Sequence, residues 1–156
     1  MNRKVSVAPM MDCTDRHERY FLRLISKNVL LYTEMIVSEA IDRGDKKKLL
    51  SFNLNEKPVA LQLGGSSSKL LSSASKIGED FGYDEINLNL GCPSKKVQKN
   101  KFGACLIKEP NLVADCLNEM QSKTNLPVTV KTRIGYDDVE DYESLFNFIN
   151  LLKSTG

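Results

Sequence analysis

The sequence lacks tryptophan and has little histidine and cysteine: among 156 residues it contains one His and four Cys. Cys13, Cys92, Cys105 and Cys116 form no Cys-x-x-Cys pair. One histidine cannot complete an ordinary Cys/His zinc site, so we expect no metal. An even number of cysteines permits disulfides, but no other feature indicates secretion, and we expect reduced thiols.

Long hydrophobic runs are also absent. No apolar stretch approaches the ~20 residues that a membrane-spanning helix needs, and the start of the chain has no apolar segment long enough for a signal peptide. We therefore expect a cytoplasmic protein that does not enter a membrane. Hydrophobic residues make up 41% of the chain and charged residues 27%, which suits a packed core and argues against disorder.

Over the whole chain, basic and acidic side chains nearly balance, and the formal net charge is +2. Residues 1–108 carry 18 basic and 12 acidic side chains, whereas residues 109–156 carry 4 basic and 8 acidic ones. The first part is therefore positive and the second negative. This segregation favours contact between the first part and a polyanion.

Strand-like runs alternate with segments of helical spacing along the whole chain. Strands are predicted at 5–10, 29–35, 58–63, 85–90 and 127–134, and helices at 16–26, 38–43, 67–80, 110–124 and 142–153. Such alternation, with apolar strands, predicts an α/β fold in which helices cover a parallel sheet. A doubly wound sheet and a β/α barrel both fit this pattern.

Several polar or long side chains lie late in the predicted strands, and this placement favours the barrel. They are Met10, Glu34, Gln62, Asn89 and Lys131. Both folds place ligand sites at the carboxyl ends of strands, but five contributing strands suit a barrel better. A complete TIM (β/α)8 barrel needs about 250 residues. The sequence therefore predicts a barrel truncated to about its first five βα units.

Seven motifs occur in an order that is typical of one enzyme family. They lie at 7–16 (VAPMMDCTDR), 31–35 (LYTEM), 60–65 (ALQLGG), 85–94 (EINLNLGCPS), 97–98 (VQ), 102–106 (FGACL) and 130–135 (VKTRIG). Any one of them is a weak signal, but the ordered set closely resembles the tRNA-dihydrouridine synthases, most of all their A-type members. The resemblance covers essentially the whole chain.

The resemblance implies an FMN-dependent oxidoreductase that reduces the C5–C6 bond of a uridine in the tRNA D-loop, with NADPH as the reductant of the flavin. Similarity to the A-type members implies uridine 20 or 20a. Residues 1–156 are then expected to be the amino-terminal part of the catalytic barrel, without the last three βα units and without the helical tRNA-binding domain. The complete enzyme is expected to be a monomer.

Cys92 is the candidate catalytic residue, and it directly follows a predicted strand, between Gly91 and Pro93. An arbitrary cysteine at such a turn is more often a small buried residue. The only histidine, His17, is far away in sequence, so nothing favours an activated thiolate. A free thiol is mostly protonated at neutral pH and can donate a proton. The resemblance assigns to Cys92 the proton that reaches C5 of uracil, while hydride reaches C6.

The tripeptide Ala8, Pro9 and Met10 is the first candidate flavin contact. It can simply end a strand against the core, but small residues and a fixed φ also let the backbone approach a flat ring. Gln62 is the second candidate, because its amide can both donate and accept at a flavin edge. Its alternative role is hydrogen bonding to loop backbone. The resemblance assigns these residues to FMN.

Lys131 is the third candidate flavin contact. A lysine inside a barrel is costly unless it is paired, and a carboxylate such as Glu34 can serve as a structural partner. In the reading that the resemblance favours, the ammonium group lies beside flavin N1 and stabilises the negative charge of the reduced ring.

Asn89 and Lys101 are the candidate contacts to tRNA. Asn89 shares one strand face with Asn87, and either side chain can tie neighbouring strands together. The resemblance assigns Asn89 to the target uridine, whose flipped base exposes donors and acceptors. Lys101 closes a loop at 95–101 that holds four lysines. Such a loop is often only solvated, but here it can meet tRNA phosphates, as can 46–48 more weakly.

Two alternatives to a tRNA-dihydrouridine synthase stay open. One is another FMN barrel that acts on a free pyrimidine, like the dihydroorotate dehydrogenases, although the motifs around Cys92 disfavour it. The other is an inactive fragment, because an open barrel exposes strand edges and lacks the phosphate site that barrels form after strands seven and eight.

Overall fold

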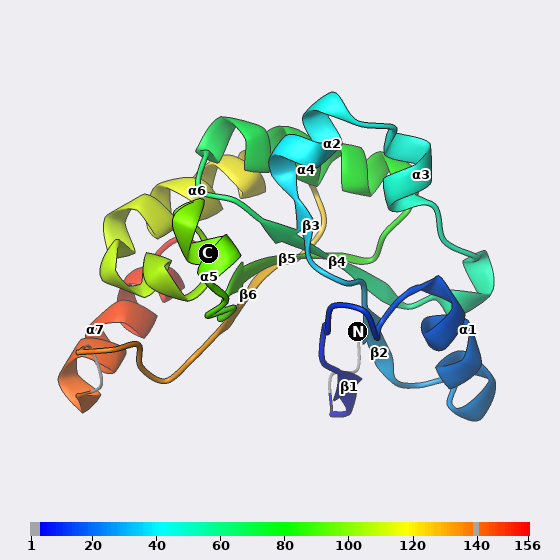
Figure 1. Cartoon of the computed structure of the whole chain (residues 1–156), viewed down its shortest axis with the longest axis horizontal. Helices are drawn as coiled ribbons and strands as arrows, with labels where there is room; N and C mark the ends of the chain where they lie inside the picture. The colour runs from blue at the N-terminus through cyan, green and yellow to red at the C-terminus, as the bar shows by residue number, and fades with distance from the viewer. Residues whose placement is uncertain (1–3, 139–140) are drawn as a thin grey trace.

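A curled parallel sheet forms the centre of the molecule (Figure 1). The computed structural model describes residues 4–138 and 141–156. Along the sheet the strands follow the chain order, which is β1 (Ser6–Val7), β2 (Leu30–Tyr32), β4 (Val59–Gly64), β5 (Glu85–Leu90) and β6 (Val128–Thr132), while the short β3 (Ile36–Val37) pairs with β4.

Helices follow the strands and line the convex side of the sheet (Figure 1). They are α1 (Arg16–Ile25), α2 (Ser38–Arg43), α3 (Lys46–Leu50), α4 (Ser68–Phe81), α5 (Lys95–Lys99), α6 (Pro110–Lys123) and α7 (Tyr142–Lys153), with 3-10 helices η1 (Leu54–Glu56) and η2 (Gly103–Lys108). Successive helices α2, α4, α6 and α7 pack side by side. A doubly wound sheet reverses its strand order and has helices on both faces. The predicted barrel architecture, present as a partial barrel, is therefore confirmed.

The main core lies between the sheet and helices α4 and α6. Leu61, Leu63, Ile86 and Leu88 are fully buried in it. Gly78 lets α4 approach the sheet closely, because a Cβ at this position would lie 2.7 Å from Cδ2 of Leu61. Burying each large aliphatic side chain stabilises the fold by roughly 1.5–3 kcal/mol, so these strands are the most strongly held part of the sheet.

Helix α1 is amphipathic, but its apolar face is turned to solvent. Phe21 is 60% exposed and Leu24 is 71% exposed, whereas Arg19 and Arg23 are buried. Arg19 Nε lies 2.7 Å from the Oε2 atom of Glu56. The Arg23 guanidinium donates to four carbonyl groups, those of Ser26, Val29, Glu56 and Pro58. Arg23 of α1 thus donates hydrogen bonds to backbone carbonyls in the loops before β2 and β4.

The predicted strand 29–35 is observed as the shorter β2, and the residues between β2 and β3 include one extra residue relative to β4. Tyr32 pairs with Ala60, but the next pair is Ile36 with Leu63. Four residue steps from Tyr32 to Ile36 therefore lie beside three residue steps on β4. Such a bulge redirects the side chains within it. Thr33, inside the bulge, accepts a hydrogen bond from the backbone N–H of Gln62 at 3.0 Å.

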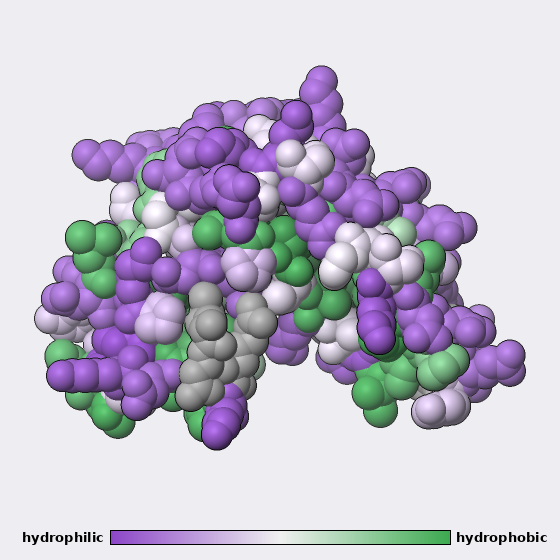
Figure 2. Space-filling model, turned by 180° about the vertical axis from the view of Figure 1, so that it is seen from behind, coloured by the Kyte–Doolittle hydropathy of each residue, from purple (hydrophilic) through white to green (hydrophobic). Residues whose placement is uncertain are grey.

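Apolar side chains are exposed at both ends of the curled sheet. On α1 they include Phe21 and Leu24, and on α7 Phe146 and Ile149 are 52% and 43% exposed. Figure 2 shows the molecule hollowed between these two ends. Within the described residues, β1 and β6 each pair on one side only. None of the described helices has the length and apolar character needed to cross a membrane.

Candidate active site on the concave face

A pocket of about 260 Å³ opens on the concave side of the sheet. Its lining comes from the carboxyl ends of five parallel strands and the loops that follow them, and consists of Pro9, Met10, Met11, Met35, Gln62, Asn89, Gly91, Cys92 and Lys131. Six of the eight residues that the sequence singled out therefore meet here. Alternation along β4, β5 and β6 explains this, because every second side chain faces the same side of a sheet.

A second pocket of about 210 Å³ adjoins the first one and shares Pro9 and Lys131 with it. Ala8 and Asn87 are among the residues that line it. Small-molecule sites commonly measure ~300–1,000 Å³, so the two spaces together are large enough for a cofactor ring and part of a substrate. The tripeptide at 8–10 thus borders both spaces.

The amides on the concave face bond to one another. Gln62 Nε2 donates to Oδ1 of Asn87 at 2.7 Å, and Asn89 Nδ2 donates to Oε1 of Gln62 at 2.9 Å. All three side chains are at least nine-tenths buried. Loop backbone is therefore not the partner of the Gln62 amide. Each amide instead lies in a fixed orientation in a network of neighbours.

The turn that carries Cys92 is held at several points. Asn89 Oδ1 accepts hydrogen bonds from the backbone N–H groups of Gly91, at 3.1 Å, and of Cys92, at 2.9 Å. Arg133 Nε donates to the carbonyl of Gly91 at 2.7 Å. The N–H of Ala104 donates to the carbonyl of Cys92 at 3.0 Å. These hydrogen bonds fix the backbone of the turn, and Cys92 lines the pocket.

Gly103 makes the approach of η2 to the Cys92 turn possible. Its φ is +76°, and a Cβ there would lie 2.6 Å from the carbonyl oxygen of Cys92 and 2.5 Å from Cγ1 of Val97. Both the left-handed backbone and the close contact exclude a side chain. This glycine lies in the motif at 102–106, and the close packing explains why the motif has a glycine at this position.

Lys131 is exposed, and the expectation that it is buried is wrong. It lies opposite Asn89 on β6. Within the described residues β6 pairs only with β5, so the other edge of β6 has no neighbouring strand. Glu34 is not its partner either, because Glu34 Oε1 accepts the N–H of Asp12 at 2.6 Å and the described ion pairs do not join it to Lys131. The ammonium group is thus available at the edge of the pocket.

The lysine-rich segment after Cys92 is a short helix, not the loop that we expected. Ser94 caps α5 by accepting the N–H of Val97, which ends the extended run at Pro93 and starts the helix. Lys101 follows the helix with a φ of +56°. It is exposed and does not line the pocket. The four lysines, at 95, 96, 99 and 101, are all exposed beside the Cys92 turn.

Three further residues line the pocket that the sequence analysis did not single out. They are Met11, Met35 and Gly91. Met35 lies in the bulge between β2 and β3, and its position at the end of a predicted strand was the available signal. Flexible thioether side chains adapt to flat apolar ligands, so the methionines give the pocket an adaptable apolar surface.

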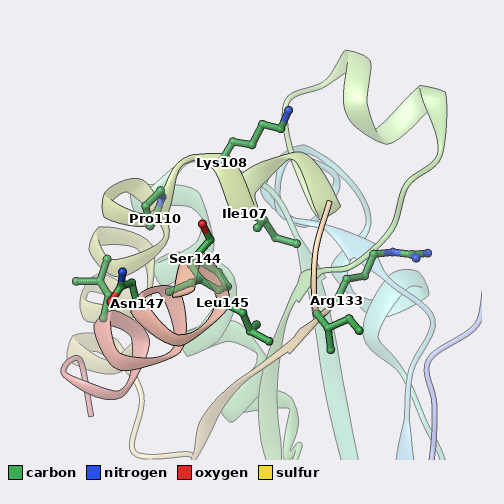
Figure 3. A pocket seen from close by; sticks show the side chains of 10 residues that line it. Ile107, Lys108, Pro110, Arg133, Ser144, Leu145 and Asn147 are labelled. Atoms are coloured by element: carbon green, nitrogen blue, oxygen red, sulfur yellow. The ribbon is translucent and has the colours of Figure 1, made fainter. Parts of the chain in front are cut away.

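A separate pocket of about 380 Å³ lies between η2, the end of β6 and α7, and its lining includes Ile107, Leu145 and Phe148 (Figure 3). Of the eight predicted site residues, none lines it. Arg133 borders it, but Figure 3 shows the guanidinium directed away from α7, in keeping with its bond to Gly91. This pocket is therefore distinct from the concave site.

Cys13, Cys92, Cys105 and Cys116 are free thiols in the structure. Burial raises the pKa of the Cys116 thiol to about 11, so this thiol stays protonated at neutral pH. Cys92 is half-buried and borders the pocket. The described residues contain no group of three His, Cys, Asp or Glu side chains that could hold a metal ion.

Comparison with known proteins identifies the relatives of this chain. Residues 6–156 match the family model described as Dihydrouridine synthase (Dus). A tRNA-dihydrouridine(20/20a) synthase of Synechocystis sp. is 56% identical over 97% of this chain and 46% of its own length. The proteins of the same name from Vibrio vulnificus and Escherichia coli K12 are 54% and 56% identical over 98% of the chain. The chain spans about half the length of these curated relatives.

Proposed function

The chain belongs to the dihydrouridine synthase family, and on that premise we propose that residues 1–156 form the amino-terminal part of a catalytic barrel that reduces the C5–C6 bond of uridine in tRNA. The names of its relatives point to uridine 20 or 20a. The observation that carries the proposal is the convergence of Gln62, Asn89, Cys92 and Lys131 on one concave pocket.

The residues around the pocket fit FMN. Pro9, Met10 and Met35 supply an apolar wall for a flat ring, while the Gln62 amide and the Lys131 ammonium supply a hydrogen-bonding edge and a positive charge. A cation beside the ring stabilises the negative charge of a reduced flavin. When bound and reduced by NADPH, FMN supplies the hydride that C6 of uracil receives.

Cys92 donates the proton that C5 requires. Reduction of the C5–C6 double bond adds one hydride and one proton, and a thiol at the pocket edge can give that proton directly to carbon. The thiolate that remains then takes a proton from water. The hydrogen bonds that hold the backbone of Gly91 and Cys92 keep the thiol at this edge.

The residues around Cys92 make the contacts to tRNA. Asn89 meets the edge of the target uracil, because its amide lies on the pocket wall three residues before the thiol. Lys101 and the lysines of α5 bind phosphates of the D-loop. Exposed lysines beside a base-binding pocket position the nucleic acid without reading its sequence.

A cysteine replacement tests this function in the protein that carries the chain. Cys92→Ala should lower dihydrouridine formation in unmodified tRNA by about 100-fold or more, while FMN content and its reduction by NADPH persist. Cys13→Ala, at an exposed thiol, is the matched control and should keep activity within about twofold. Unchanged turnover in Cys92→Ala contradicts the general-acid role. Reduction of free uracil or orotate without any action on tRNA contradicts the substrate and favours the free-pyrimidine alternative.

A further inference from the structure

The hydrogen bonds on the concave face form one chain that runs in a single direction. Starting at the Cys92 N–H, it passes through the amides of Asn89, Gln62 and Asn87, each of which accepts with its oxygen and donates with its nitrogen. The nitrogen of Asn87 donates to Oγ1 of Thr129 at 2.9 Å. The direction of every amide in the chain is therefore tied to that of its neighbours.

At each end of this chain of hydrogen bonds stands a group that can act only as a donor or only as an acceptor. At one end, the backbone N–H groups of Gly91 and Cys92 only donate, so Asn89 must turn its oxygen toward them. At the other end, one carboxylate oxygen of Glu85 accepts from the hydroxyls of Tyr32 and Thr129. A carboxylate oxygen that receives two O–H donors is an acceptor only.

Thr129 transmits this polarity to the amides. Its hydroxyl has one proton, which it gives to Glu85, so toward Asn87 it can only accept. Asn87 must therefore present its nitrogen to Thr129 and its oxygen to Gln62. Without the Thr129 hydroxyl, the buried amide nitrogen of Asn87 would lose this acceptor. The Asn87 amide could then turn over and place its nitrogen against the amide nitrogen of Gln62.

This arrangement decides which hydrogen-bonding atoms the pocket offers. Asn89 Oδ1 already accepts two hydrogen bonds, and its amide nitrogen has used one N–H on Gln62. The Gln62 nitrogen has likewise used one N–H on Asn87. Among the described residues, one N–H on each of Gln62 and Asn89 keeps no partner, and both side chains line the pocket. The wall therefore presents N–H donors.

We propose that Glu85, Thr129 and Asn87 are positioning residues that fix the polarity of the Gln62 and Asn89 amides. The pocket then selects ring ligands whose facing edge carries carbonyl oxygens or unprotonated ring nitrogens. Glu85 and Thr129 line neither of the two concave pockets, and Asn87 lines only the smaller one, so all three influence the 260 Å³ pocket through Gln62. Identifying the ring with a flavin or uracil rests on the proposed function, whereas the orientation of the amides does not.

A pair of substitutions at Thr129 tests the relay. Thr129→Val keeps the shape but removes the hydroxyl, and Thr129→Ser keeps the hydroxyl. We expect the dissociation constant for FMN to rise about tenfold in Thr129→Val and to stay within about twofold in Thr129→Ser. In a Gln62→Met background, Thr129→Val should change the constant less than twofold, because the relay acts through the Gln62 amide. A tenfold loss in that background as well, or none in either background, overturns the proposal.

A measurement without ligand separates this proposal from the proposed function. The side-chain ¹⁵NH₂ signals of Gln62, assigned by their absence in Gln62→Met, should be sharp in the ligand-free parent and in Thr129→Ser, and broadened or shifted in Thr129→Val. Unchanged signals in Thr129→Val overturn the relay. If the parent protein takes up no FMN, the flavin function fails and the relay is decided by these signals alone.

Discussion

The two faces of strands β4 and β5 are buried to a similar degree but by different chemistry. On the convex face, Leu61 and Leu88 are fully buried under α4 and α6. On the concave face, Gln62 is 1% exposed and Asn89 is 8% exposed, and both are held by amide hydrogen bonds. Burial alone therefore does not distinguish the face that stabilises the fold from the face that carries the site.

The difference lies in how strictly each face constrains its residues. Apolar packing is non-directional, so side chains of similar volume can replace one another at a cost that is usually below about 1.5 kcal/mol. A buried amide network is directional, and one missing partner leaves an unsatisfied polar group. We therefore expect substitutions on the convex face to change stability, and substitutions on the concave face to change ligand binding.

The largest effect is expected on the convex face. Leu88→Ala should lower the free energy of unfolding by about 3 kcal/mol, because it opens a cavity under α4 and α6. Leu54→Ala, at a side chain that is 76% exposed, should cost less than about 0.5 kcal/mol. Urea unfolding followed by circular dichroism measures both. Equal costs for the two variants would break the comparison between the faces.

A smaller effect is expected in α1, where arginines replace apolar packing. Arg23→Met should lower the free energy of unfolding by about 2 kcal/mol, because the carbonyls of Val29, Glu56 and Pro58 lose a buried donor. Its exposed neighbour provides the control: Leu24→Ala should change stability by less than about 0.5 kcal/mol. A greater loss in Leu24→Ala would mean that the apolar face of α1 is packed after all.

The smallest effect is expected at the exposed edge of the concave face. Lys131→Gln should raise the dissociation constant for FMN about tenfold, or about 1.4 kcal/mol, and leave thermal unfolding of the ligand-free protein nearly unchanged. Lys123→Gln removes the same charge from the exposed side of α6 and should leave FMN binding unaltered. Equal FMN affinity in both variants would remove Lys131 from the flavin site.

Local signals in the sequence predicted most element boundaries. Helix α4 ends at Phe81 because Gly82 takes a φ of +90°, and α6 begins at Pro110, where proline suits a first helical turn. The predicted limits lie within two residues of the observed ones for both helices. The carboxyl ends of β4, β5 and β6 likewise indicated Gln62, Asn89 and Lys131 as pocket residues.

Other features depend on contacts between distant segments, and local patterns did not reveal them. The apolar spacing of α1 shows that the helix has two faces, but not which face is inside. That depends on loop carbonyls that need the Arg23 donor. The exposure of Lys131 depends on the absence of a described strand beyond β6.

By itself, the sequence determined the order of strands and helices, which follows from local periodicity, and its ordered motifs indicated the family and six of the nine residues that line the pocket. Only the tertiary structure decided how those residues bond. Gln62 and Asn87 are 25 residues apart along the chain and Asn87 and Thr129 are 42 apart, and strand register makes each pair neighbours. A hydrogen bond needs its two atoms within about 3 Å, which only the folded sheet provides.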